Sequence, residues 1–342
     1  MSGKKLVDTK LVFDESFFRE EERLGFTISS MMKRAWAAQL EVLLEIDRLC
    51  KQLNINYYAD FGTLLGAVRH NGYIPWDDDI DICMLREDYY VFLRESPDLL
   101  DKWYDISSVY NDPERDIVKA RVINGRHINF DKSFLDKFHN CPYVVGVDIF
   151  PVDNVPDGDD LLQELKDSLS FLLKVEASIP EEGPYEEDVL QIMEDIENTF
   201  GLPIDYNNRL RHEVKKIYDI LSAIYVEDDT EYVGCMMAIA AEMGLYRYKK
   251  QDFVPYKRVE FENITIPIMK CYKEVLLSCY GQDYMTPKNI GASHDYPFYK
   301  EQIIGLKDVM EKEYNKEFEY DFVEEFIEMK VEEVINTAND SL

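Results

Sequence analysis

The sequence has few of the features that mark membrane, secreted or zinc-binding proteins. Its 342 residues contain no apolar run of about 20 residues, so we expect no segment that crosses a bilayer. Charged residues break the apolar pieces near the N-terminus, which is therefore not expected to be a signal peptide. The six cysteines form no CxxC pair, which argues against a zinc site. Reduced core cysteines suit a cytoplasmic protein, and that is the predicted location.

Basic residues and nucleotide-binding glycine motifs are also scarce. Lysine and arginine number 38 against 68 aspartates and glutamates, which gives a formal net charge of -30. Such a surface repels nucleic-acid backbones and anionic membranes, so nucleic acid is not an expected partner. A bound polyanion would need a local basic pocket or a metal ion. The sequence has neither GxxxxGK[ST] nor GxGxxG, and P-loop and Rossmann folds therefore lack support.

What the sequence does contain predicts a globular α+β protein. Hydrophobic residues make up 46% of the chain and aromatic residues 13%. An apolar face over Thr27–Leu53 predicts a helix capped by Ser29 or Ser30, and a shorter helix is expected over residues 64–70. Strands are predicted at residues 55–59, 79–84, 103–109, 117–123, 144–150 and 259–266, a loop at 151–160, and helices at about 160–200, 207–226 and 322–336. The pattern describes a small sheet in the first half, flanked by helices from both ends.

The densest chemistry lies in the segment PWDDDIDI, residues 75–82. Side chains alternate across a strand, so Asp79 and Asp81 should share one face, about 6.5 Å apart at their Cα atoms. Two such carboxylates can hold one divalent ion or bridge two, and Mg²⁺ relieves their mutual repulsion. An acidic surface turn is the other interpretation. A calcium-binding loop is excluded, because Ile82 and Asp88 stand where glycine and glutamate are required.

A glycine turn precedes this segment. Gly62 and Thr63 stand between the predicted strand and the short helix that follows it. A glycine lets backbone N–H groups approach a ligand closely, the helix presents its positive end there, and a threonine hydroxyl can donate as well. The turn therefore predicts a phosphate site, with helix capping as the plain alternative.

Three further groups are candidates for the same site. Asp148 is the one charge in the apolar run 144–150, which indicates an ion pair, a metal ligand or a general base for an acceptor hydroxyl. Lys119 and Arg121 alternate on a predicted strand and could neutralise phosphate charge, or form a surface ion pair. His294 lies in a loop and could contact donor or acceptor.

These residues lie in strings that resemble the LicD family. The matching pieces are spread over most of residues 30–300, and they include LEVLL at 40–44, GTLLGAVRH at 62–70, GYIPWDDDID at 72–81, GVDIFPVD at 146–153 and YGQDYM at 280–285. The family includes bacterial phosphocholine transferases that decorate teichoic acids or lipopolysaccharide, and fukutin and fukutin-related protein, which transfer ribitol phosphate, are similar. One departure is Asp60-Phe61, which stands where the family often has a second glycine.

The resemblance implies a nucleotidyltransferase-like fold and an enzyme that uses Mg²⁺ or Mn²⁺. Asp79 and Asp81 would bind the metal with Asp148 as the third acid, and Gly62 and Thr63 would hold donor phosphate. The implied reaction moves a substituted phosphate, such as phosphocholine, from a CDP-linked donor to a hydroxyl of a cell-surface glycan or its precursor. A true nucleotidyltransferase acting on an NTP is the alternative, because the same acidic pair serves both reactions. A binding protein without activity is disfavoured, since all the acids are present.

The expected organisation has three parts. Residues 1–26 form a lead-in, residues 27–157 form the nucleotidyltransferase-like catalytic core, and residues 158–342 form a mostly helical region that completes the LicD domain and the acceptor site.

Overall fold

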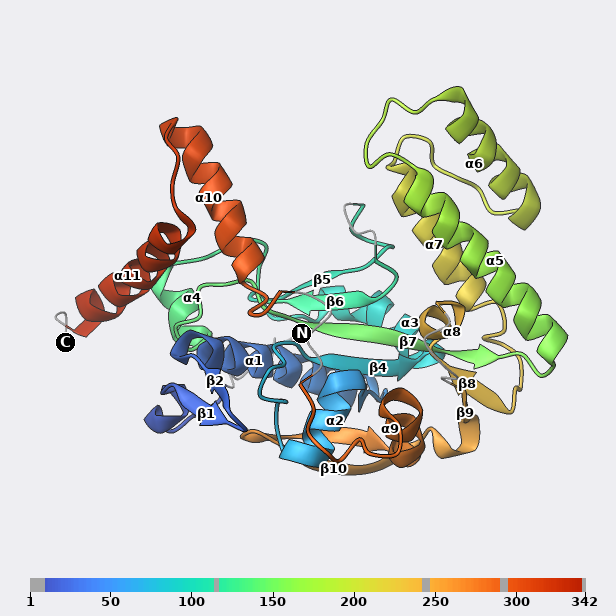
Figure 1. The fold of residues 1–342 in the computed structure, drawn as a ribbon. Helices are drawn as coiled ribbons and strands as arrows, with labels where there is room; N and C mark the ends of the chain where they lie inside the picture. Colours follow the sequence, from blue (N-terminus) through green and yellow to red (C-terminus); the bar gives the residue numbers. More distant parts are fainter. Residues whose placement is uncertain (1–9, 114–116, 242–246, 290–294, 340–342) are drawn as a thin grey trace, which may run out of the picture.

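The protein is built around one mixed sheet. The computed structural model describes residues 10–113, 117–241, 247–289 and 295–339. The strand order is β3-β4-β7-β6-β5, and β8 and β9 extend it from the far end of β7 (Figure 1). β4 and β7 run parallel, and every other pair is antiparallel. The strands are β3 (Tyr58–Ala59), β4 (Asp81–Leu85), β5 (Asp105–Ser107), β6 (Ala120–Ile123), β7 (Gly146–Val155), β8 (Tyr232–Gly234) and β9 (Arg247–Lys249). A mixed sheet flanked by helices confirms the predicted α+β class.

The central strand β7 is longer than the sequence suggested. The predicted loop at 151–160 is wrong over its first half, because β7 continues through Pro151 to Val155 and is buried along its whole length. β7 pairs with β6 only up to Ile149, and β8 is its antiparallel partner from Asp153 onwards. Pro151, which has no N–H to donate, therefore falls between two antiparallel partners, where a proline is tolerated in a strand.

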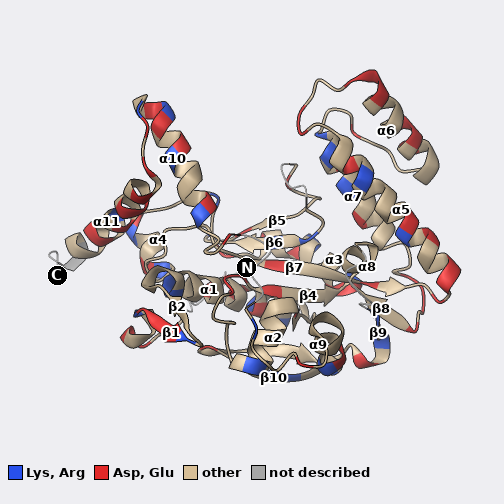
Figure 2. Ribbon diagram, in the orientation of Figure 1, with Lys and Arg blue, Asp and Glu red and all other residues tan. Residues whose placement is uncertain are grey.

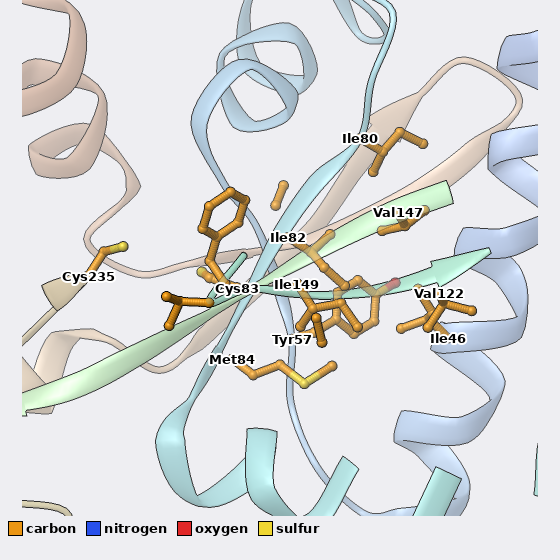
Figure 3. Packing of buried hydrophobic residues seen from close by; sticks show 14 of the residues in the cluster. Ile46, Tyr57, Ile80, Ile82, Cys83, Met84, Val122, Val147, Ile149 and Cys235 are labelled. Carbon is orange, nitrogen blue, oxygen red and sulfur yellow. The ribbon is translucent and has the colours of Figure 1, made fainter. Parts of the chain in front are cut away.

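The helix α1 (Ser30–Leu53) forms much of the core beside the sheet. The Ser29 hydroxyl caps it by accepting the Met32 N–H at 3.2 Å, as predicted, and Asn54 ends it in the left-handed region with φ 55°. Its apolar face includes Trp36, which is fully buried. Ile46 from the same helix lies beside Val122 in Figure 3 and belongs to the same hydrophobic core as Ile82, Val147 and Ile149.

The second half of the chain adds helices around this core. The predicted helix at 160–200 is wrong as a single element: α5 (Asp159–Ser178) and α6 (Glu187–Phe200) are separated by a turn that contains Pro180 and Pro184, and proline cannot continue a helix. The other helices are α2 (Phe61–His70), α3 (Arg86–Glu95), α4 (Lys132–Lys137), α7 (Leu210–Ser222), α8 (Met236–Ala240), α9 (Tyr272–Tyr280), α10 (Lys300–Tyr314) and α11 (Tyr320–Asn339).

Two hairpins lie outside the main sheet. The strands β1 (Glu21–Arg23) and β2 (Phe26–Ile28) form the first. The second corrects the single strand predicted at 259–266: β10 (Pro255–Phe261) turns at Glu262, which has φ 50°, and returns as β11 (Ile264–Met269). Two hydrogen-bonded strands joined by a tight turn read in sequence as one long β-rich run.

The helices at the two ends of the molecule are strongly charged. Figure 1 shows α10 and α11 near one end of the sheet and α5, α6 and α7 near the other, and Figure 2 shows acidic residues along α5, α6, α10 and α11. Within the part of the chain that the structure describes, no helix combines the length and apolar character needed to span a bilayer.

Candidate active site

The acidic segment that precedes β4 is held from behind by α1. The indole Nε1 of Trp36 donates to the Asp77 carbonyl oxygen at 3.2 Å, and Nε2 of Gln39 donates to the Asp78 carbonyl oxygen at 2.7 Å. Both donors come from the buried face of α1. A run of three adjacent carboxylates repels itself, and these hydrogen bonds fix its backbone against that repulsion.

Three carboxylates of this segment lie close together. Asp77, Asp78 and Asp79 each offer an oxygen, and these oxygens lie within 4.8 Å of one another. Burial raises the pKa of Asp77 well above its usual range, and the nearby charge of Asp79 raises it further. The Asp78 carboxylate has a different task, because its Oδ2 accepts the backbone N–H of Phe298 at 2.6 Å. Asp77 therefore joins Asp79 as a candidate ligand that the sequence interpretation did not include.

Asp81 begins β4 and lies beside Asp148 in the parallel register of β7. The Asp148 N–H donates to the Ile80 carbonyl oxygen at 2.9 Å and ties the two strands together there. Oδ1 of Asp81 is inaccessible to solvent and accepts no hydrogen bond from any described residue. Burial raises the pKa of Asp81, as do the charges of Asp79 and Asp148. A buried, unsatisfied carboxylate oxygen beside other carboxylates is the environment that a hard divalent cation suits.

Asp148 is held by the two cations that the sequence placed near the site. Its Oδ2 lies 2.6 Å from Nζ of Lys119, and its Oδ1 lies 3.5 Å from Nε of Arg121. The ion-pair interpretation of these residues therefore describes the structure. The same three residues also line, with Asp79, a cavity of about 780 Å³. Four of the predicted site residues thus face one shared space.

Gly62 and Thr63 both contact the acidic residues. A Cβ added to Gly62 would overlap Oδ2 of Asp77, so only a glycine leaves that carboxylate its place. The Thr63 hydroxyl oxygen accepts the Asp81 N–H at 2.8 Å. These contacts explain both residues through the carboxylates that they position, and contact with a donor phosphate stays a prediction.

The residue before Gly62, where the sequence departs from the family pattern, has a left-handed backbone conformation. Phe61 has φ 41°, a left-handed conformation that glycine adopts without cost. The Asp60 carboxylate caps the helix there by accepting the Phe61 N–H at 2.9 Å. The fold therefore keeps the backbone shape that a glycine would favour.

Two histidines bear on the site, one that the sequence predicted and one that it did not. His294 lies outside the residues that the structure describes. His127, which sequence interpretation missed, is exposed and lines the cavity. The one signal for it was its position just beyond the predicted strand that carries Lys119 and Arg121.

A family model and several known proteins are similar to this chain. Residues 54–153 match the family described as LicD/FKTN/FKRP, nucleotidyltransferase domain. The chain is 28% identical over 254 residues to the lipopolysaccharide cholinephosphotransferase LicD of Haemophilus influenzae, a match that covers 72% of this chain and 88% of that protein. An uncharacterized protein of Rickettsia typhi is 41% identical over 66 residues, 19% of this chain and 21% of that protein. Another, from Rickettsia prowazekii, is 48% identical over 48 residues, 14% of this chain and 18% of that protein.

The matched region contains α2, β4, β6 and most of β7, and with them the acidic segment, both cations and Asp148. Residues 54–153 therefore form a LicD-type nucleotidyltransferase domain, and the similarity to the Haemophilus protein extends over 72% of the chain.

Proposed function

We propose that the protein transfers a substituted phosphate, such as phosphocholine, from a CDP-linked donor to a hydroxyl of a cell-surface glycan or its precursor. The observation that carries the proposal is the single cavity faced by Asp79, Asp148, Lys119 and Arg121. Carboxylates for a metal ion and cations for phosphate are the two parts that phosphoryl transfer requires. The name of the Haemophilus relative, a lipopolysaccharide cholinephosphotransferase, supports the donor group and the class of acceptor.

The acidic residues fit a divalent cation. Asp77, Asp79 and Asp81 would hold Mg²⁺ or Mn²⁺, since they offer hard oxygen ligands and one of those oxygens is buried without a hydrogen bond from the described residues. When bound, the ion supplies charge stabilisation for the diphosphate of the donor. Thr63 and Gly62 contribute by fixing the positions of Asp81 and Asp77. The N–H groups at the start of α2 are the proposed contact for donor phosphate.

The other side chains act on the reacting groups. Lys119 and Arg121 offset the negative charge that the phosphate bears during transfer. The acceptor oxygen forms a bond to the phosphorus that carries the substituent, the bond from that phosphorus to the CMP oxygen breaks, and CMP leaves with the electron pair. The acceptor proton passes to Asp148. A ligand role for Asp148 is the alternative, and a variant described in the Discussion separates the two.

The reaction is tested by its products. The protein is incubated with CDP-choline, CDP-ethanolamine or a CDP-polyol, with Mg²⁺ and delipidated lipopolysaccharide oligosaccharide, and CMP and the mass of the oligosaccharide are measured. We expect CMP together with a glycan that has gained the phosphate and its substituent. A parallel incubation with CTP in place of the CDP-linked donor tests the nucleotidyltransferase alternative. Pyrophosphate from CTP without CMP from any CDP-linked donor would replace this proposal with the nucleotidyltransferase alternative.

We also propose a cytoplasmic site of action. The support is chemical: the six cysteines form no disulfide and five of them are buried, as in proteins of reducing compartments. Fractionation of cells that express the protein tests this location.

A further inference from the structure

The helix α10 is fixed to the site at two points, although it lies far from it in sequence. The Phe298 N–H, just before the helix, donates to Oδ2 of Asp78 at 2.6 Å. The Gln302 side chain, in the first turn, accepts the Val144 N–H at 3.0 Å and donates to the Val144 carbonyl oxygen at 2.8 Å. One tether reaches the acidic segment and the other reaches the chain just before β7. The first turns of α10 are therefore held in place beside the acidic residues.

One stripe of α10 forms a wall of the cavity. Gln302, Gly305, Leu306 and Val309 line it, at the spacing that places residues on a single face of a helix. The turn after β6 also lines it, through His127 and Ile128. We refer to the region at Asp79 and Asp148 as the inner part of the cavity, and to the region lined by this turn and α10 as its outer part.

Gly305 lies in the middle of α10 without a packing reason. A Cβ added there would meet no atom within 4 Å. Glycine in a helix interior is destabilising relative to alanine, so neither the helix nor its neighbours favour it. Because Gly305 has no side chain, the outer part of the cavity is wider at this position.

The two parts of the cavity suit different ligands. The inner part has Lys119 and Arg121 for phosphate. In the outer part the Arg126 guanidinium is engaged, since its Nε lies 2.6 Å from Asp105 and its Nη1 lies 3.2 Å from Asp112. Glu301 adds a carboxylate there, so the outer part disfavours a second phosphate.

The remaining groups of the outer part match a sugar ring. Ile128 and Val309 provide apolar surface, and Val309 is half exposed. His127 and Glu301 provide groups that can hydrogen-bond to hydroxyls. A neutral ring with one apolar face and several hydroxyls uses both kinds of group, as specific small-molecule sites do.

We propose that the outer part is the subsite for the acceptor sugar and that Gly305 sets its width. The inference rests on the proposed function, because it divides one cavity between the donor phosphate and the acceptor. It assigns acceptor choice to α10, a helix outside the region that matches the family domain.

Substitution of Gly305 by alanine and by phenylalanine tests the subsite. Because Gly305 is exposed, both variants should fold, and Gly305→Ala should melt about 2 °C higher than wild type. We expect Gly305→Phe to lower kcat/KM for the oligosaccharide acceptor at least about tenfold, as added bulk does in a substrate pocket. CMP release by hydrolysis of the donor, in which water replaces the acceptor, should stay within about twofold of wild type. Ile304→Phe adds bulk at an exposed neighbour that does not line the cavity, and it should leave both rates unchanged.

Three outcomes would overturn the subsite. Equal loss of acceptor transfer in Ile304→Phe would show a general effect on α10. Unchanged acceptor kinetics in Gly305→Phe would show that the outer part is not used. Weaker binding of CDP-choline to Gly305→Phe, measured by calorimetry, would place the donor there instead.

Failure of the proposed function has a different signature. In that case wild type releases no CMP from any CDP-linked donor, and the subsite is tested by direct binding of delipidated lipopolysaccharide oligosaccharide. The subsite then predicts binding to wild type that is lost in Gly305→Phe and kept in Ile304→Phe. No binding to wild type, or equal binding to Gly305→Phe, would refute it.

Discussion

The contact between Gly62 and Asp77 gives a substitution that should separate activity from stability. Gly62→Ala adds one methyl group in the first turn of α2, and that carbon would overlap Oδ2 of Asp77. The overlapped atom is the end of a side chain, so the carboxylate can rotate away and the backbone need not move. Replacement of glycine by alanine in a helix gains up to about 1 kcal/mol, so the free energy of unfolding should hold or rise.

The Gly62→Ala substitution should instead weaken the metal site. Groups that orient metal ligands typically contribute about 10- to 100-fold to affinity or activity, and we expect a loss in that range for Gly62→Ala. The assay titrates Mg²⁺ against CMP release and measures unfolding in urea on the same preparations. Donor affinity in the presence of EDTA is also measured, because it reports direct contact between Gly62 and donor phosphate.

A second glycine in the same helix provides the contrast. A Cβ at Gly66 would overlap the carbonyl oxygen of Gly72, a backbone atom that cannot rotate away. Gly66→Ala should therefore lose stability, by about 1–3 kcal/mol. If Gly62→Ala keeps wild-type activity at limiting Mg²⁺, the place of Asp77 in the metal site is refuted. If it weakens donor binding in EDTA, Gly62 contacts the donor itself.

Three further predictions concern other buried charges. Arg86→Met should cost about 3–5 kcal/mol in urea unfolding, because it leaves Asp153 and Asp219, at 2.6 and 2.9 Å from the guanidinium, buried without their cation; a loss under about 1 kcal/mol would show that solvent screens this network. Asp148→Asn should keep donor and Mg²⁺ affinity and abolish transfer if Asp148 is the base, whereas weaker Mg²⁺ binding would make it a ligand. Burial raises the pKa of Asp60 to about 6 from 3.8, so the folded state binds more protons than the unfolded state between these values and wild type loses stability as pH rises through them. Asp60→Asn, which keeps the helix cap, should lack this slope, with a difference of up to about 3 kcal/mol in the free energy of unfolding at pH 7, and parallel stability–pH curves would contradict the assignment.

Local patterns in the sequence predicted the elements whose causes are local. The helix α1 begins at Ser29 because a serine hydroxyl can cap it, and its apolar spacing is visible without a structure. The strands that carry Arg121 and Asp148 were identified because apolar residues surround their charges, and Lys119, which the prediction placed in the first of them, lies just before β6. The acidic segment was evident from its composition.

Features that depend on distant partners could not be predicted in this way. Pro151 indicated a loop, and only the change of partner from β6 to β8 makes it acceptable in a strand. Asp77 was not included because the predicted strand began at Asp79. The strand β4 begins only at Asp81, so side-chain alternation governs neither Asp77 nor Asp79. The wall provided by α10 depends on hydrogen bonds from Phe298 and Gln302 to residues that lie over 150 positions away.

The most direct test of metal-dependent transfer at the acidic segment is CMP release by Asp81→Asn as a function of Mg²⁺ concentration. Asp81 is chosen because its buried Oδ1 accepts no hydrogen bond from the described residues. We expect Asp81→Asn to lose nearly all turnover. In the absence of metal it should unfold at or above the urea concentration that unfolds wild type, since a repelling charge has been removed. Asp98→Asn, at an exposed position, should match wild type in both respects. Near-wild-type CMP release by folded Asp81→Asn would contradict the central claim.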